Sequence, residues 1–243
     1  MSAPPRTGFL HGGAFHQLAA LADPAVRAWR PREIYLPEAG DADFAGLDTL
    51  IVSDRLHPGL LARAAPALLR VAHEGGTVVV LGENEITGWL PGVRGLLAAE
   101  TNFWWWRTGA DNGVRLNHPD HPAWGHLTER AVRWHYHGLL EPPEGATPLV
   151  HTVMEHHGEP EHRQVLLYED LVSTAGRLIV TTMDPVYHHG SRFMPGATQL
   201  LYGLLRWTGT RMPVHGPTEP LRNAVGPGPT TRGGDMRPAT SGR

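Results

Sequence analysis

Short apolar runs alternate with a helical pattern over the first hundred residues. The runs are bounded by turn residues, as is typical of strands buried on both faces: TGFLH (7–11), REIYLP (32–37), DTLIVS (48–53) and TVVVLG (77–82). Between the last two runs, leucines and alanines recur at helical spacing from Pro58 to the glycine pair at 75–76, and Pro66 is expected to kink this helix. Strand, helix and strand in this order predict a parallel sheet with helices on its faces.

The alternation stops between residues 100 and 165, where the chain is rich in histidine and aromatic residues. Short alternating segments there indicate irregular strands and loops, inserted so that they cover one end of the sheet. The regular pattern returns with QVLLYE (164–169), GRLIVTTMD (176–184) and a helix over 195–207. We therefore predict one α/β domain over residues 1–208, with a mostly parallel, flavodoxin-like sheet and helices on both faces.

Residues 209–243 are rich in proline, glycine, arginine and threonine and show no periodicity. This composition is typical of an extended or disordered segment. A tail of this length can also wrap a neighbouring subunit, so a homo-oligomer or an assembly partner held through the tail is an open alternative.

Composition excludes several classes of function. The 243 residues contain no cysteine, and all 21 cationic residues are arginine, so thiol nucleophiles, zinc–thiolate sites and lysine Schiff bases are ruled out. The net charge is −3 and no basic block occurs, so we expect no nucleic-acid partner. No apolar run approaches the roughly 20 residues of a membrane span. The N-terminus lacks the pattern of a secretion signal, and we expect a cytoplasmic protein with no membrane partner.

Two stretches together resemble a known family. HEGGTVVVLGENE, followed by AGRLIVTTMDPVYHHGSRFMPGATQLLYGLLRW, is similar to the ThuA-like branch of the class I glutamine-amidotransferase-like fold. The resemblance covers residues 48–90 and 165–208. True amidotransferases carry a cysteine at the turn after the strand, where this chain has residues 82–85, so glutamine hydrolysis through a thioester is excluded. The resemblance implies a fold and a link to sugar metabolism, and it implies no mechanism.

Two loops of this fold leave strand ends at the same edge of the sheet. Ligands of open α/β sheets bind beyond the carboxyl ends of the strands. The loops over 82–87 and 184–190 would therefore bring carboxylates, imidazoles and an amide together, as acid–base chemistry requires: Glu83, Asn84, Glu85, Asp184, Tyr187, His188 and His189. The alternative is that Asp184 caps the turn and the histidines fill a polar corner.

A second cluster is WHYHG (134–138). His135 and His137 are two residues apart, so on a strand they share a face and can chelate a metal such as zinc, iron or manganese. Asp184, His188 or a glutamate would supply a third ligand and leave a position open. The alternative is that both imidazoles form hydrogen bonds in a lid.

Three consecutive tryptophans occur in FWWWR (103–107). They cannot all face one core in an extended segment, so Trp105 is a candidate wall for stacking on a sugar ring, and Arg107 a candidate clamp for a carboxylate or phosphate. An aromatic plug between the insertion and the sheet is an equal alternative.

Three functions fit these residues. The first is binding, and modification by acid–base chemistry, of a small polar, carbohydrate-like ligand. In it Asp184 or Glu83 would be the base, with His188 or His189 as the acid. The second is a non-catalytic assembly protein that uses the tryptophans and the tail as contact surfaces. The third is a metal-dependent hydrolase in which His135 and His137 converge with Asp184.

Overall fold

A computed structural model describes residues 6–82, 84–97, 107, 109, 111–134, 136–153 and 164–209. The tail over 210–243, most of the tryptophan cluster, Glu83 and His135 therefore lie outside the described residues. No helix among the described residues is both long and apolar enough to cross a membrane.

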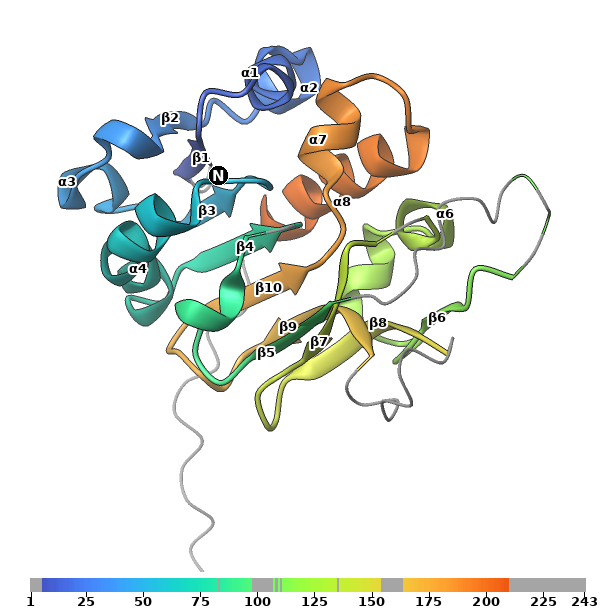
Figure 1. Ribbon diagram of the computed structural model, residues 1–243. Coiled ribbons are helices and arrows are strands. Elements are labelled where there is room, and N and C mark those ends of the chain that lie inside the picture. Colours follow the sequence, from blue (N-terminus) through green and yellow to red (C-terminus); the bar gives the residue numbers. More distant parts are fainter. Residues whose placement is uncertain are drawn as a thin grey trace, which may run out of the picture. The chain divides into compact units, whose positions relative to one another are not determined.

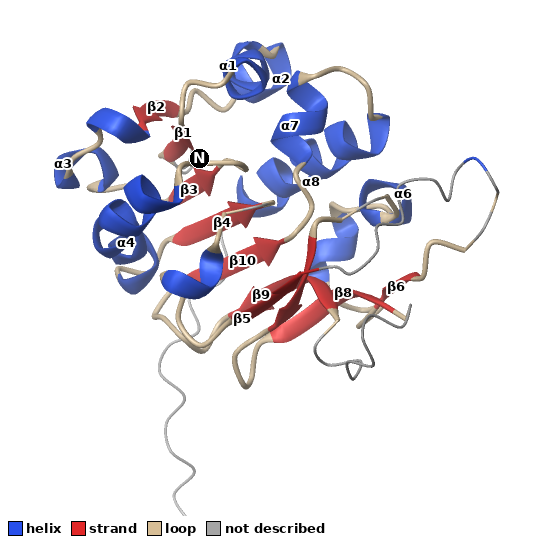
Figure 2. Ribbon diagram, in the orientation of Figure 1, coloured by secondary structure: helices blue, strands red, loops and turns tan. Residues whose placement is uncertain are grey.

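Ten strands of the described chain form one sheet (Figures 1 and 2). The strands are β1 (Thr7–His11), β2 (Arg32–Tyr35), β3 (Thr49–Val52), β4 (Thr77–Leu81), β5 (Arg94–Leu97), β6 (Val114–Leu116), β7 (Gly138–Glu141), β8 (Thr147–Thr152), β9 (Val165–Asp170) and β10 (Arg177–Thr181). The main path runs β2-β1-β3-β4-β10-β9-β7-β5, and β8 pairs with both β6 and β9. Strands β2, β1, β3, β4 and β10 pair in parallel, whereas the strands beyond β10 pair antiparallel.

The described helices are α1 (Phe15–Ala22), α2 (Pro24–Arg27), α3 (Asp41–Phe44), α4 (Pro58–His73), α6 (Glu129–Val132), α7 (Pro185–Gly190) and α8 (Pro195–Gly209). Short 3-10 turns cover Leu36–Glu38, Ile86–Gly88 and Pro122–Gly125. In Figure 2 the helices flank the parallel part of the sheet, and α7 lies beyond the end of β10 beside α1.

The strand residues divide between two apolar cores because side chains alternate along a strand. In β4, Val79 and Leu81 join the core that contains α8, while Val78 and Val80 join the core that contains α4. Both faces of the parallel strands are therefore buried under helices, as the unbroken apolar runs predict.

The predicted α/β fold with a mostly parallel central sheet is confirmed. The runs before residue 100 form parallel strands, and Pro66 lies inside α4, which continues through it. Strand β2 ends at Tyr35, earlier than expected, because the next residues turn into a 3-10 helix that contains Pro37. The segment after Asp184, expected as a loop, is the short helix α7.

Candidate functional site

Asp184 lies at the carboxyl edge of the parallel sheet, between the end of β10 and the first turn of α7. Its side chain is fully buried, and it does not cap its own helix. The capping role belongs instead to Asp54, which follows β3: its Oδ2 accepts hydrogen bonds from the backbone amides of Val186 (2.9 Å) and Tyr187 (3.0 Å). The alternative expected from the sequence, in which Asp184 caps the turn, is therefore not observed, since Asp54 caps the helix.

Two imidazoles converge on one oxygen of Asp184. The Nε2 atom of His188 lies 3.0 Å from Asp184 Oδ1, and the Nε2 atom of His137 lies 3.1 Å from the same oxygen. The potential ligand atoms of all three residues lie within 4.8 Å of one another. His188 stands four residues after Asp184, and one turn of helix brings its side chain back over the carboxylate.

The other oxygen of Asp184 is held by Arg55. The guanidinium donates to Asp184 Oδ2 from Nη2 (2.8 Å) and from Nε (3.2 Å), and it also lies over the ring of Tyr187, 4.1 Å from the ring centre. Burial opposes ionisation of Asp184. Hydrogen bonds from His137 and His188, together with their positive charge, outweigh that effect and hold the pKa of Asp184 well below its usual range. Asp184 is therefore an anion.

Gly82 allows a second carboxylate to approach Asp184. A Cβ atom added to Gly82 would lie 2.7 Å from the Cβ atoms of both Asp54 and Asp184, and the residue has a φ of 61°. Only glycine meets both demands without strain. Burial, and then the charge of Asp184, raise the pKa of Asp54 to about 8. The two acids on either side of Gly82 therefore differ at neutral pH, since Asp54 keeps its proton while Asp184 is ionised.

His16 extends the site on the side of Asp54. Its Nε2 atom lies 3.7 Å from Asp54 Oδ1, and neither buried atom has a hydrogen-bond partner. Burial and the nearby Arg55 lower the pKa of His16, although Asp184 opposes them. The rings of His16 and Tyr187 pack in a T-shaped arrangement, with 5.0 Å between the ring centres.

The loops that carry these groups are tied together by Asn84. Its side chain is buried, donates to the carbonyls of Ser53 (2.7 Å) and Leu81 (2.9 Å), and accepts from the amide of Leu56 (2.9 Å). Asn84, predicted as a ligand-binding residue, thus joins the turns after β3 and β4, and its hydrogen bonds hold Arg55 next to Asp184.

The other residues that the sequence predicted for the site do not all lie near Asp184. Tyr187 lies in the site, beneath Arg55. His189 points away from Asp184, since it contacts Thr198 (Nδ1 to Oγ1, 2.9 Å) and lies 3.6 Å from Asp23. Glu85 is exposed with a φ of 39°, and no described contact brings it to Asp184. Arg107 is exposed, and the sites proposed for Glu83, Trp105 and His135 fall on residues outside those described.

Three members of the site were not predicted from the sequence: His16, Asp54 and Arg55. A signal was present, because SDR at 53–55 follows a buried strand as directly as the polar residues after β4 and β10 do. Parallel pairing of β3 with β4 and of β4 with β10 places all three turns at one edge.

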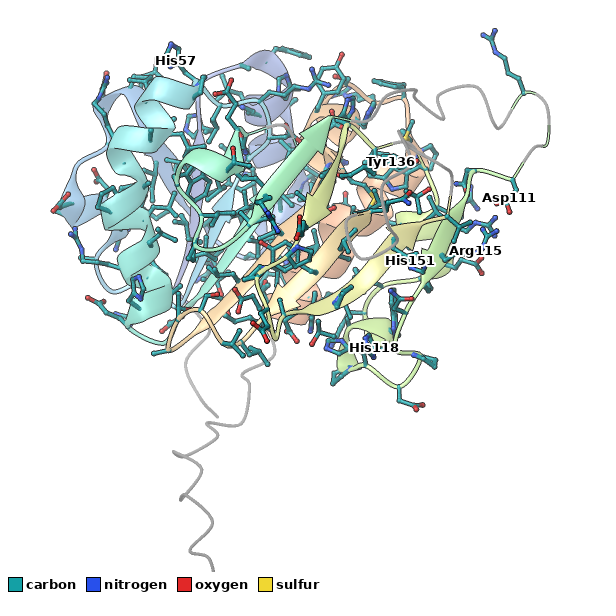
Figure 3. All side chains as sticks on the ribbon, turned by 60° about the horizontal axis from the view of Figure 1, so that its bottom comes forward. His57, Asp111, Arg115, His118, Tyr136 and His151 are labelled. Carbon is teal, nitrogen blue, oxygen red and sulfur yellow. The ribbon has the colours of Figure 1, made fainter. Side chains whose placement is uncertain are left out.

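Among the described residues, the other histidine-rich segments contribute no group to this site. His57 and His118 lie at the periphery in Figure 3, apart from the labelled Tyr136, which is buried in the interior. His121 contacts Glu169 instead, with 3.0 Å between Nε2 and Oε2. Of the expected His-x-His pair, the structure places His137 and describes nothing of His135.

Comparison with known proteins identifies the fold. No family model and no curated protein matches the chain. A protein of Thermoplasma acidophilum described as a GMP synthase component matches with a TM-score of 0.50 at 10% identity, over 86% of this chain and 96% of the other. A ThuA-like protein of Bacteroides uniformis matches with a TM-score of 0.47 at 11% identity, over 86% of this chain and 93% of the other.

A protein of Salmonella typhimurium, described as cytoplasmic, gives a TM-score of 0.49 at 11% identity, over 83% of this chain and 98% of the other. At such identities only the fold is shared. The chain has a class I glutamine-amidotransferase-like fold, as the resemblance in sequence implied.

Proposed function

We propose that the carboxyl edge of the sheet binds a small polar, carbohydrate-like ligand and acts on it by acid–base chemistry. The observation that carries this proposal is the pair of buried acids on either side of Gly82, whose surroundings raise the pKa of Asp54 to about 8 and hold the pKa of Asp184 below its usual range. Two titratable groups whose environments drive their pKa values apart are typical of an acid and a base assigned to different tasks.

The proton-carrying half of the proposed site consists of Asp54 and His16. Asp54 is fully buried and cannot touch a ligand, whereas the side chain of His16 is 14% exposed. A small rotation of the imidazole would close the 3.7 Å gap to the roughly 2.7–3.2 Å of a hydrogen bond. His16 would then exchange a proton with the ligand, and Asp54 would position the ring and replace or accept that proton.

The anionic half consists of Asp184 with its three partners. Because both oxygens of this buried carboxylate are surrounded by cationic or imidazole groups, Asp184 is better suited to orienting His137 and His188 than to removing a proton itself. This assignment revises the roles expected from the sequence, in which Asp184 was the base. Arg55, whose side chain is 32% exposed, lies where it can attract a polar or anionic part of the ligand.

The absence of a thiol nucleophile fits the same geometry. Cysteine cannot replace Gly82, because its Cβ would collide with both acids. The turn that presents a thiol in amidotransferases is used here to bring two carboxylates together.

The experiment is a screen of monosaccharides, polyols and sugar acids by saturation-transfer NMR, followed by proton NMR of each binder for chemical conversion. The wild type should bind and convert at least one compound. His16→Gln and Asp54→Asn should slow conversion by about 10²–10⁴-fold, the usual contribution of general acid–base catalysis. The exposed His73→Ala is the control. A panel that yields no binder, or equal conversion by His16→Gln, contradicts the proposal.

A further inference from the structure

We propose that His137, Asp184 and His188 bind one divalent first-row transition-metal ion, namely zinc, iron or manganese. The role of the ion in a reaction rests on the proposed function. Its binding does not, because it can be measured with no other ligand present. Nothing in the shared fold assigns such a site to this chain.

The spacing of the three side chains fits an ion. Two ligand atoms about 2.1 Å from a metal are about 3.0 Å apart at a right angle and about 3.4 Å apart at the tetrahedral angle. The distances from Asp184 Oδ1 to the two Nε2 atoms are 3.0 Å and 3.1 Å. All three potential ligand atoms lie within 4.8 Å of one another, so an ion placed beside Asp184 Oδ1 lies near both imidazoles.

The donor set defines the class of metal. Imidazole nitrogen suits zinc, copper, iron and nickel, and carboxylate oxygen suits harder ions such as manganese and magnesium. Two imidazoles with one carboxylate are therefore typical of zinc, iron(II) or manganese(II). Three protein ligands also leave at least one coordination position for another molecule.

The backbone fixes the three ligands before any ion arrives. Asp184 and His188 lie one turn apart, and the amide of His188 donates to the carbonyl of Asp184 (3.3 Å). The amide of His137 donates to the carbonyl of Thr182 (3.4 Å), which ties this third ligand to the end of β10. Ligands held on a short helix and on a strand end cost little further entropy to order on binding.

Arg55 orients the carboxylate in the way that metal sites require. Its two hydrogen bonds occupy Asp184 Oδ2, so Oδ1 is the oxygen turned toward both imidazoles. Partners of this kind, which hold a ligand without touching the metal, typically contribute about 10–100-fold to metal affinity.

The charge of Arg55 also indicates which kind of group would fill the open coordination position of the ion. Arg55 already balances the charge of Asp184, and the two imidazoles are neutral when they coordinate a metal. A divalent ion would therefore leave two positive charges uncompensated in a largely buried site. An anionic group, such as a carboxylate or phosphate of the ligand, would compensate them and could pair with Arg55 as well. Among carbohydrate-like ligands, sugar acids and sugar phosphates are the classes that fit.

The competing explanation is a cluster without metal, in which both Nε2–H groups donate to Asp184 Oδ1. The two explanations predict different metal contents and different heats of metal binding. Untagged protein purified without chelators would be analysed by plasma mass spectrometry. Protein stripped with a chelator would then be titrated with ZnCl₂ and MnCl₂ by calorimetry. We expect near one ion per chain, and binding weakened by at least about 100-fold in His188→Ala and Asp184→Asn.

Two controls use other histidines of the chain. The exposed His73→Ala and the double variant His156→Ala/His157→Ala, in the histidine-rich stretch over 151–163, should keep the ion. His16→Gln should also keep it, which separates metal binding from the proposed proton transfer. Circular dichroism melting checks that each variant folds. Metal-free wild type that shows no heat with either salt overturns the inference. The inference is also overturned if His188→Ala keeps the ion and the double variant His156→Ala/His157→Ala loses it.

Discussion

Buried ionic groups lie at both ends of β10, and the two clusters differ in how their charges are matched. At the amino end, Glu169 contacts His121 and Arg177, with 3.0 Å from Oε2 to His121 Nε2 and 3.5 Å from Oε1 to Arg177 Nη1. Arg177 also donates to Thr77 Oγ1 (3.2 Å) and lies over the ring of Trp207. Each group there has a partner from a different part of the fold, including His121 from the inserted region, so this cluster ties the insertion to the sheet. Arg177 Nη1 makes no hydrogen bond, but it lies beside the carboxylate of Glu169 and its charge is therefore matched.

At the carboxyl end, the groups are less completely matched. Two imidazoles share one oxygen of Asp184, and Asp54 Oδ1 and His16 Nε2 face each other across 3.7 Å without a hydrogen bond. Buried polar groups that the chain leaves unsatisfied cost stability, and they are typical of sites that a ligand, an ion or a proton completes. The difference indicates that the first cluster is structural and the second functional.

The largest effect is expected from Glu169→Ala. This change leaves Arg177, which is 3% exposed, without its carboxylate, and burial already lowers the pKa of Arg177. Removing one partner of a buried pair typically costs about 3–5 kcal/mol of unfolding free energy. The loss of unfolding free energy is measured by urea unfolding, monitored by circular dichroism. Metal content per folded chain should not change, and a metal-free but stable variant would contradict the division between the clusters.

Gly82→Ala should have the next largest effect. A methyl group there meets the Cβ atoms of Asp54 and Asp184 and adopts an unfavourable φ. We expect a loss of about 2–4 kcal/mol in unfolding free energy, from backbone strain and overpacking, together with the loss of metal binding. Gly88→Ala is the matched control, because the added methyl group has no neighbouring atom within 4 Å. Equal stability of the two variants would show that Gly82 does not set the distance between the acids.

A smaller effect, in the pH dependence of stability, is expected from Asp54. The folded state keeps its proton up to about pH 8, whereas the unfolded state loses it at about pH 3.9. The raised pKa means that the folded protein binds more protons between these values. Unfolding free energy should therefore fall as pH rises, by up to about 1.4 kcal/mol per pH unit. Asp54→Asn lacks this contribution. Urea unfolding of both proteins, stripped of metal, from pH 5 to 7 should show converging or crossing curves, and parallel curves would contradict the raised pKa.

The smallest effect is expected from Arg55→Gln. Glutamine removes the charge and one of the two hydrogen bonds to Asp184 Oδ2, so zinc affinity should weaken by about 10-fold through poorer orientation of the carboxylate. Binding of a sugar acid should weaken more than binding of a neutral sugar. Calorimetry with each ligand separates the two effects, and unchanged preference for the acid would remove Arg55 from ligand recognition.

Much of the fold was predictable from sequence because strands buried on both faces give unbroken apolar runs. TVVVLG and GRLIVTTMD were assigned correctly for this reason. The antiparallel strands β5 to β8 were less accessible, since their segments are short and mix polar with apolar residues.

The site was predictable only in part. Asp184, His188 and His137 were accessible because acids and imidazoles follow a strand or share a face. Arg55, Asp54 and His16 act through contacts between residues far apart in the chain, such as the 129 positions that separate Arg55 from Asp184. His189 shows the converse limit. It adjoins His188 in sequence, but neighbouring residues on a helix point in different directions, and it faces Thr198 instead.

The most direct test of the acid–base account is the protonation state of Asp54. Carbon-13 NMR of chelator-stripped protein labelled at the aspartate carboxyl carbons would follow its signal with pH, with the assignment made by loss of that signal in Asp54→Asn. We expect the signal to stay at the position of a protonated acid through pH 7 and to titrate near pH 8, while Asp184 stays ionised down to the acid limit of the fold. A titration of Asp54 near pH 4 would contradict the account, because both acids beside Gly82 would then be anions and neither could supply a proton.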